Sequence, residues 1–305
     1  MITERTIGWG QKRRSRHRRL FVGAATLLMM TGALGPARTI AGATNLGPVN
    51  VLYAGSFLDL MQRQLIPAFQ RATGYSVSGV SNGSSALASE IDGGTQVGDV
   101  FISASPSADA TLHQAANGDW VTSYDTFATS RLVLGYNPAS TFAKALTSKP
   151  WYEVVDQRGF LLGRTDPATD PKGVLAVTAL TQIATTHHLP ALGALARSSS
   201  NVFAETALIG ELQSGQLDAG FFYAVEAAAA HLKTVALSGT NLSASYTVAV
   251  LKNAPHKKGA EAFVRFLLSP TGRRILRANG VTPIVPAKVV TLPSSPGSTN
   301  TTAKG

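Results

Sequence analysis

The sequence contains no cysteine in its 305 residues. This absence excludes disulfide bonds, zinc or iron–sulfur sites with cysteine ligands, and a thiol nucleophile. It also excludes the lipid anchor of bacterial lipoproteins, because that anchor is attached to a cysteine at the mature N-terminus. A binding site in this chain must therefore be built from hydroxyls, carboxylates, amines and backbone amides.

Long apolar stretches are scarce as well. The stretch from Leu20 to Leu34 is short for a membrane helix, which needs about 20 residues. It follows a basic run and precedes the small residues Ala41-Gly42-Ala43, an order that predicts a signal peptide over residues 1–43. Arg18-Arg19 resembles a twin-arginine export signal. We expect an exported protein, periplasmic or on the extracellular face of the cytoplasmic membrane, that is soluble after signal cleavage.

Acidic side chains are fewer than basic ones, 17 against 27, but the predicted leader causes most of the difference. Eight basic residues and one acidic residue precede residue 44, so the mature chain has 19 basic and 16 acidic residues. Its net charge is then +3, not the +10 of the whole chain. We therefore expect no nucleic-acid partner.

Two turns of small residues follow strand-like stretches early in the mature chain. The apolar run 51–54 leads into Gly55-Ser56, and the run 75–80 leads into Ser81-Asn82-Gly83-Ser84-Ser85. A helical pattern follows each turn, so hydroxyls and unpaired backbone N–H groups face any anion that approaches. If the two strands are parallel neighbours, the turns share one crevice. A serine before a helix is also a common N-cap, so neither turn alone establishes a ligand site.

The order of strands and helices predicts two lobes. Alternation up to residue 103 favours a parallel sheet with helical crossovers. The extended segments 127–138 and 244–251 are suited to cross between lobes, which predicts a hinge and a cleft. We assign residues 48–130 and 245–286 to lobe 1 and residues 131–244 to lobe 2. Residues 287–305 are polar and rich in Pro, Ser and Thr, and we expect them to form a flexible tail.

Three later stretches are candidates for the second side of the cleft. Asp166 and Asp170 lie in a proline-stiffened turn, Glu205 precedes a helical pattern, and Tyr223 ends an aromatic strand-like run. Each residue also has a purely structural explanation. Asp caps helices, Glu is favoured in a first helical turn, and a buried Tyr needs one hydrogen-bond partner. The sequence leaves both explanations open.

Five short motifs, taken in order, resemble those of the molybdate/tungstate-binding proteins of ABC importers. They lie at residues 54–56, 82–88, 99–104, 170–173 and 222–227, and the resemblance extends over residues 49–283. It implies an α/β, two-lobed, periplasmic-binding-protein-like (type II) fold with mixed sheets, a hinge and a central cleft. It also implies a tetrahedral oxyanion between the lobes, a membrane permease as partner, a monomer, no cofactor and no catalysis.

The same resemblance implies a set of ligand-binding residues. These are Ser56, Ser84, Ser85 and Tyr223, with Gly55 and Lys172 beside them. Lys172 and Glu205 depart from the common bacterial pattern, which has small or apolar residues at these positions. A carboxylate beside a dianion is repulsive unless it binds the metal centre, as archaeal-like members allow. Asp170 and Glu205 are thus candidate direct ligands of molybdenum or tungsten. The alternative is that both point to solvent.

Three rival functions stay open. The same fold would also suit sulfate, phosphate or a small organic anion. An exported hydrolase would use Ser56 or Ser84 as its nucleophile, although no His lies in a recognisable partner motif. An adhesin or sensor ectodomain would bind another protein through the same lobes.

Overall fold

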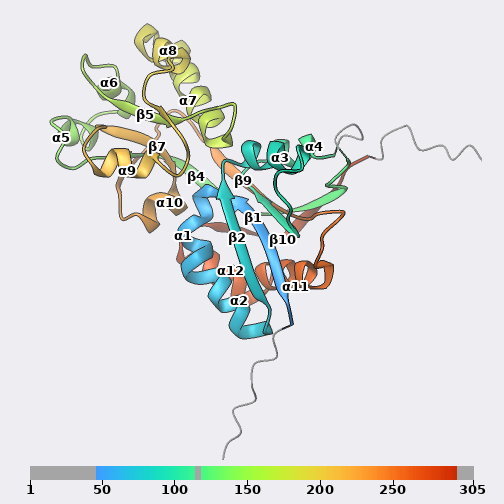
Figure 1. Ribbon diagram of the computed structural model, residues 1–305. Helices are drawn as coiled ribbons and strands as arrows, with labels where there is room; N and C mark the ends of the chain where they lie inside the picture. The colour runs from blue at the N-terminus through green and yellow to red at the C-terminus, as the bar shows by residue number, and fades with distance from the viewer. Residues whose placement is uncertain (1–45, 114–117, 294–305) are drawn as a thin grey trace, which may run out of the picture. The chain divides into compact units, whose positions relative to one another are not determined.

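The computed structural model of this protein describes residues 46–113 and 118–293 (Figure 1). The predicted signal peptide and residues 294–305 lie outside this part of the chain. All described residues belong to one compact unit, Ala43–Gly305. In the described ranges, no helix combines the length and the apolar character needed to cross a membrane. The lobe boundaries at residues 130 and 244 stay a prediction.

Strands and helices alternate along most of the chain. The strands are β1 (Pro48–Ala54), β2 (Ser76–Asn82), β3 (Val100–Ser103), β4 (Ser123–Tyr136), β5 (Leu162–Thr165), β6 (Val202–Phe203), β7 (Ala219–Tyr223), β8 (Lys233–Ala236), β9 (Ser243–Val250) and β10 (Thr282–Thr291). The helices are α1 (Leu58–Leu60), α2 (Ile66–Thr73), α3 (Ser84–Asp92), α4 (Pro106–Thr111), α5 (Ala143–Leu146), α6 (Trp151–Val155), α7 (Pro171–His187), α8 (Pro190–Arg197), α9 (Leu208–Gln213), α10 (Ala224–Ala229), α11 (Lys257–Leu267) and α12 (Pro270–Ala278).

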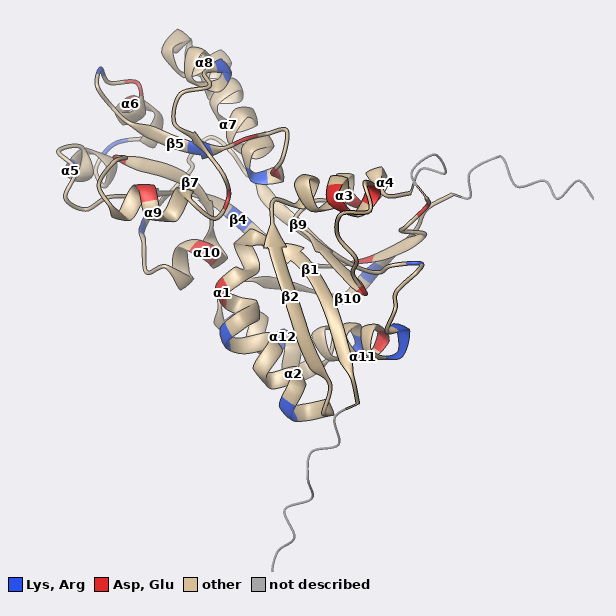
Figure 2. Ribbon diagram, viewed as in Figure 1, with Lys and Arg blue, Asp and Glu red and all other residues tan. Residues whose placement is uncertain are grey.

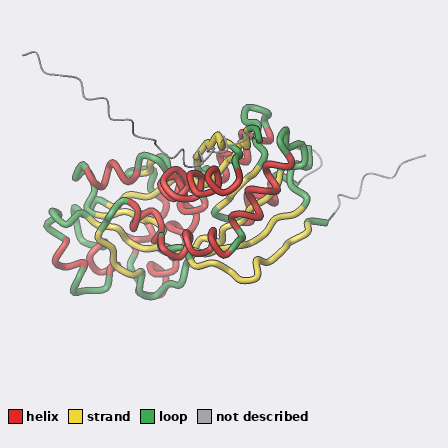
Figure 3. The backbone as a smooth tube through the Cα atoms, turned by 90° about the horizontal axis from the view of Figure 1, so that it is seen from below, coloured by secondary structure: helices red, strands yellow, loops and turns green. Residues whose placement is uncertain are grey.

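The strands form one mixed sheet in the order β2-β1-β3-β9-β4-β7-β5-β6. The long strand β4 belongs to both halves of this sheet. Its first part pairs with β9 and β10, and its second part pairs with β7 and β8. Helices lie against the strands when the chain is seen from below (Figure 3). The segment that was predicted to cross between lobes is thus one continuous strand.

The two serine turns lie at the same edge of the sheet. Strand β1 is parallel to β2, with a register that runs from Pro48 opposite Ser76 to Ala54 opposite Asn82 (Figure 1). Because both strands end at the same level, the turns that follow them are neighbours. This confirms the predicted parallel pairing of the two strand-and-turn units.

The helical stretch after Ser56 is irregular. A 3₁₀ turn (Gly55–Phe57), α1, a π-helical turn (Met61–Leu65) and α2 follow one another, and Pro67 lies in the first turn of α2. Pro67 cannot donate a backbone hydrogen bond, so the regular ladder is interrupted before it. Regular α-helix therefore starts again only with α2.

The predicted tail begins too early. Strand β10 continues to Thr291, and its residues Lys288 to Thr291 pair antiparallel with Thr126 to Ser123 of β4. Val289 and Val290 favour extended backbone and so support a strand here. The polar composition of the segment indicated a tail instead, because the strand that pairs with it lies far away in the sequence. The prediction of a flexible tail is therefore wrong for residues 287–291.

A buried acid on α4 lies against β9. Asp109 is fully buried, the Thr247 hydroxyl donates to its Oδ2 at 2.5 Å, and its Oδ1 has no partner. Burial raises the pKa of Asp109 from its ordinary value of 3.8 to about 7, and the Thr247 hydrogen bond opposes this rise only in part. The folded state therefore holds this proton in a pH range where the unfolded state has lost it.

We predict that Asp109 makes the protein less stable as the pH rises. The stabilisation is complete below pH 3.8, falls as the pH approaches 7, and is absent above that. An Asp109→Asn variant keeps a neutral side chain at every pH. Its free energy of unfolding should exceed that of the parent at pH 8 by on the order of 2–4 kcal/mol, with little difference near pH 4. Urea unfolding between pH 4 and 8 measures this. The Glu153→Gln variant, at an exposed position, is the control. Parallel pH profiles for parent and Asp109→Asn would refute the prediction.

Candidate functional site

The turn after β1 holds a carboxylate. The backbone N–H groups of Gly55 and Ser56 donate to the two oxygens of Glu205, at 2.9 and 2.8 Å. Glu205 comes from the loop between β6 and α9 and is almost fully buried. A Cβ atom at Gly55 would lie 2.5 Å from the Glu205 oxygen, so this approach requires glycine. The backbone donors of this predicted turn therefore hold a carboxylate of the same chain.

A buried ammonium lies behind this carboxylate. Lys172, in the first turn of α7, is 0% exposed, and its Nζ lies 2.8 Å from both oxygens of Glu226. The same Nζ lies 3.6 Å from Glu205. Asp170 caps the helix, because its Oδ1 accepts the Lys172 backbone N–H at 2.9 Å. Figure 2 shows both signs of charge at the start of α7 and acidic charge on α10.

The acids outnumber the base in this buried cluster, and the pKa directions reflect this. Burial by itself lowers the pKa of Lys172, but Glu226, Glu205 and Asp170 together raise it above its ordinary value. Burial, and then the Asp170 carboxylate, raise the pKa of Glu205, whereas Lys172 lowers it. Burial also raises the pKa of Glu226, against the effect of Lys172. The ammonium therefore stays charged, and the carboxylates are short of positive partners.

The hydroxyl of Ser56 faces a tyrosine from β9. Ser56 Oγ and the Tyr246 hydroxyl are 2.9 Å apart, and the Tyr246 ring packs on Phe57 with centroids 4.1 Å apart. Sequence reasoning placed Tyr246 in a crossing strand and not in the site. The signal that could have found it is the single phenol of β9, because a buried hydroxyl needs a partner.

Three buried polar atoms near the start of α7 have no partner. They are Thr165 Oγ1, Asp170 Oδ2 and the Tyr223 hydroxyl, from side chains that are 0%, 1% and 0% exposed. Thr165 ends β5 and Tyr223 ends β7, and these strands are parallel neighbours. Burial and then the Asp170 carboxylate raise the pKa of Tyr223. Lys172 Nζ, in the first turn of α7, lies 5.8 Å from the centroid of the Tyr223 ring. Unpaired buried polar atoms mark a place where a ligand or water belongs.

The second serine turn packs against the segment before α7. A Cβ atom at Gly83 would clash with the Thr169 carbonyl oxygen, which accepts the Ala86 N–H at 3.1 Å. Ser84 is buried, and its Oγ accepts the Ala104 N–H at 3.0 Å, which leaves its own proton free to donate. Ser85 is half-buried beside it. Both predicted turns therefore contact the elements that carry Asp170 and Glu205.

A groove of about 370 Å³ opens beside the buried cluster, where α1 contacts α10. Glu205, Glu226, Gly55 and Ser56 form its inner end. The remaining lining residues are Leu58, Asp59, Gln62, Arg63, Thr206, Ile209, Gln213, Ala229 and Ala230. Two carboxylates of the cluster, Glu205 and Glu226, therefore line this groove, whereas Lys172 does not.

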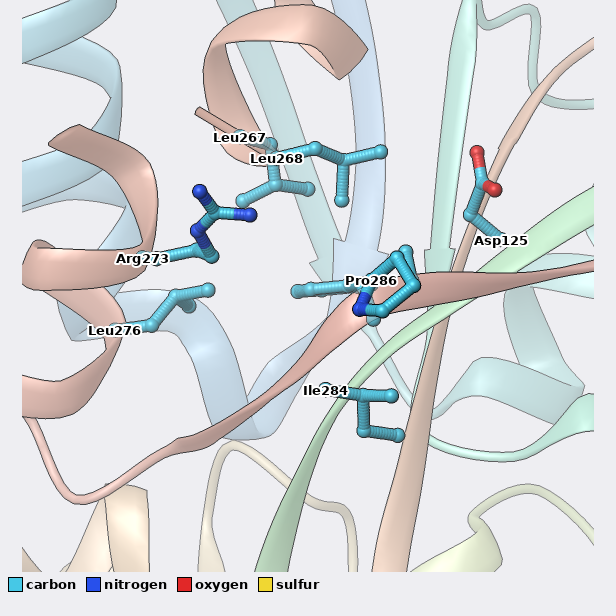
Figure 4. A pocket seen from close by; sticks show the side chains of 9 residues that line it. Asp125, Leu267, Leu268, Arg273, Leu276, Ile284 and Pro286 are labelled. Atoms are coloured by element: carbon cyan, nitrogen blue, oxygen red, sulfur yellow. The ribbon is translucent and has the colours of Figure 1, made fainter. Parts of the chain in front are cut away.

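A second cavity, of about 260 Å³, lies between the α11–α12 segment and strands β4 and β10 (Figure 4). Arg273 and Asp125 reach it from opposite sides, and most of its other lining side chains are apolar. It shares no residue with the buried cluster. We assign no role to it.

Across residues 46–113 and 118–293, no group of three or more His, Asp or Glu side chains is placed to hold a metal ion. A molybdate or tungstate ion already carries oxygens on its metal, so two carboxylates from the protein would suffice to complete the coordination of that metal. Direct ligation by Asp170 and Glu205 stays a prediction.

The serines show no arrangement for nucleophilic catalysis. Residues 79–83 spell G-x-S-x-G, but Ser81 lies within β2 and not on a strand-to-helix turn. Ser56 pairs with Tyr246, and Ser84 accepts from Ala104. In the described part of the chain, neither serine has a His partner.

We predict that Ser56 and Tyr246 act as one unit. Ser56→Ala or Tyr246→Phe leaves one buried hydroxyl unpaired, and each should destabilise the protein by about 1–3 kcal/mol. The double variant removes both hydroxyls and should cost little more than one single change. Denaturant unfolding of the three variants measures the coupling. Additive losses would show that the two hydroxyls do not depend on each other.

The chain is similar to several characterised and uncharacterised binding proteins. It is 29% identical to an uncharacterized solute-binding protein of Halobacterium salinarum, with 82% of this chain and 87% of that protein covered. It is 30% identical to a putative ABC transporter molybdenum-binding protein of Haloferax volcanii, with 68% and 65% covered. It is 26% identical to the molybdate/tungstate-binding protein WtpA of Pyrococcus abyssi, with 51% and 60% covered.

The fold is that of periplasmic binding proteins. The chain matches the Azotobacter vinelandii periplasmic molybdate-binding protein with a TM-score of 0.60 at 21% identity, covering 78% of this chain and 99% of that one. The iron-bound HitA of Pseudomonas aeruginosa matches with a TM-score of 0.53. Residues 49–282 match the family model of the bacterial extracellular solute-binding proteins. This protein therefore belongs to the bacterial extracellular solute-binding protein family.

Proposed function

We propose that this protein captures molybdate or tungstate outside the cytoplasmic membrane and delivers the ion to an ABC-type permease. The observation that carries the proposal is the pair of hydrogen bonds from Gly55 and Ser56 to both oxygens of a carboxylate. Two backbone donors at the start of a helical stretch converge on one negatively charged group, which supports an oxyanion-binding role for this turn. The names of the Haloferax and Pyrococcus relatives support the choice of ion.

The charge of the cluster favours a metal oxyanion over sulfate or phosphate. Three buried carboxylates, Asp170, Glu205 and Glu226, face one ammonium, and a dianion placed among them would be repelled. A molybdenum or tungsten centre differs because carboxylate oxygens bind it directly. Asp170 offers an unpaired Oδ2, and Glu205 offers oxygens that now accept the cradle amides. The unpaired Tyr223 hydroxyl would donate to an oxo group.

Capture would proceed without catalysis. Hydroxyl and amide dipoles replace the hydration shell of the ion, and binding favours the state in which the segments around the site are closed. The groove beside Glu205 is the route by which the ion reaches the cluster. The permease then receives the loaded protein.

We predict that molybdate or tungstate raises the melting temperature of the purified chain. A ligand at 100 times its Kd stabilises the native state by about 2.7 kcal/mol, which corresponds to about 5–10 °C for a domain of this size. Sulfate and phosphate, added separately, should give little shift. Ser56→Ala and Asp170→Asn should reduce the response, whereas Ser89→Ala, an exposed serine on α3, should not. No shift with any of the four ions would rule the proposal out.

A further inference from the structure

Lys172 is the one base in the buried cluster, and its donors are mostly taken. An ammonium has three N–H donors. Two of them are directed at the oxygens of Glu226, each at 2.8 Å, and the third faces Glu205 at the longer distance of 3.6 Å. The side chain is fully enclosed, so water does not compete for these donors. The cluster thus contains a positive charge that is already committed to a carboxylate of the protein.

Glu226 is itself held in place by the backbone. Its Oε1 accepts the Tyr223 N–H at 2.7 Å, at the point where β7 ends and α10 begins. Only 5% of Glu226 is exposed, and it lies at the inner end of the groove. A fixed carboxylate fixes its counterion, so Lys172 does not swing freely toward a ligand.

We propose that Glu226 determines specificity by withholding the Lys172 donors from the cargo. This inference rests on the proposed function, since it assumes that an oxyanion binds at the cluster. Glu226 does not touch the ion. It acts through Lys172 and is therefore a positioning residue.

The physical reason lies in how the two classes of oxyanion are held. Sulfate and phosphate lose their hydration in a buried site and need donors and positive charge in exchange. With Glu226 in place, the site offers them mainly carboxylates, so they are rejected. Molybdate and tungstate depend less on the ammonium, because carboxylate oxygens bind their central atom. Specificity here comes from repelling the wrong ions as well as from attracting the right one.

The decisive variant is Glu226→Gln. Its amide oxygen still accepts the Tyr223 N–H, but the site loses one negative charge. An amide NH2 replaces the Oε2 acceptor, so the ammonium keeps only one of its two bonds to this side chain. Calorimetric titration should show sulfate affinity rising at least tenfold, with a smaller change for molybdate. The ratio of the sulfate Kd to the molybdate Kd should therefore fall. Glu226→Ala also frees the ammonium and predicts the same direction, so either variant serves if one does not fold.

Two controls separate positioning from general charge and folding effects. The double variant Lys172→Met with Glu226→Gln has no ammonium to release, so the gain in sulfate affinity should disappear. Glu153→Gln makes the same charge change at an exposed site and should leave the ratio unchanged.

The outcomes distinguish this inference from the proposed function. If the parent protein binds none of the ions, the proposed function fails first. If the parent binds molybdate but Glu226→Gln leaves the ratio unchanged, the inference about Glu226 is wrong. A gain in sulfate affinity that persists in the double variant would also overturn it, because the gain would not come from Lys172.

Discussion

The site depends on one interaction, the contact of the Glu205 carboxylate with the backbone amides of Gly55 and Ser56. It joins residues that are 149 and 150 positions apart in the chain. It requires that β1 ends at this turn, that residue 55 has no side chain, and that the loop after β6 reaches the same point. Lys172 then has a fixed negative neighbour, and Glu226 completes the arrangement from α10.

The folding stability of the protein does not explain why these charges are buried together. Burying charges costs several kcal/mol for each ion, and a well-packed apolar core would often do as well or better. Three carboxylates with one ammonium is a poor arrangement for folding, since two carboxylates lack a full partner. The unpaired atoms of Thr165, Asp170 and Tyr223 point the same way. The cluster therefore makes most sense as a binding site that retains its charges for a ligand.

The sequence was most informative where chemistry and local structure coincide. The small-residue turn at Gly55-Ser56, the parallel strands and the Asp170 cap follow from short-range patterns, and the structure contains each of them. The family resemblance added Lys172 to the candidate residues.

The partners of these residues were beyond such reasoning. Lys172 pairs with Glu226 across 54 positions, and Ser56 meets Tyr246 across 190, so no local pattern connects them. The pairing of β10 with β4 was missed for the same reason. The composition of a segment indicates how polar it is, but not whether a distant strand pairs with it. Sequence patterns thus indicated candidate residues, whereas the charge balance around them depends on the tertiary contacts.

The most direct test of this account is X-ray absorption spectroscopy of the tungstate-loaded protein. The account predicts that the metal has oxygen neighbours beyond its own oxo groups, at the longer distances typical of carboxylate ligands, and that Asp170→Asn and Glu205→Gln reduce their number. A spectrum that shows only the oxo groups, identical to that of free tungstate, would contradict it. The ion would then be held by hydrogen bonds alone, and the excess of buried carboxylates would need another explanation.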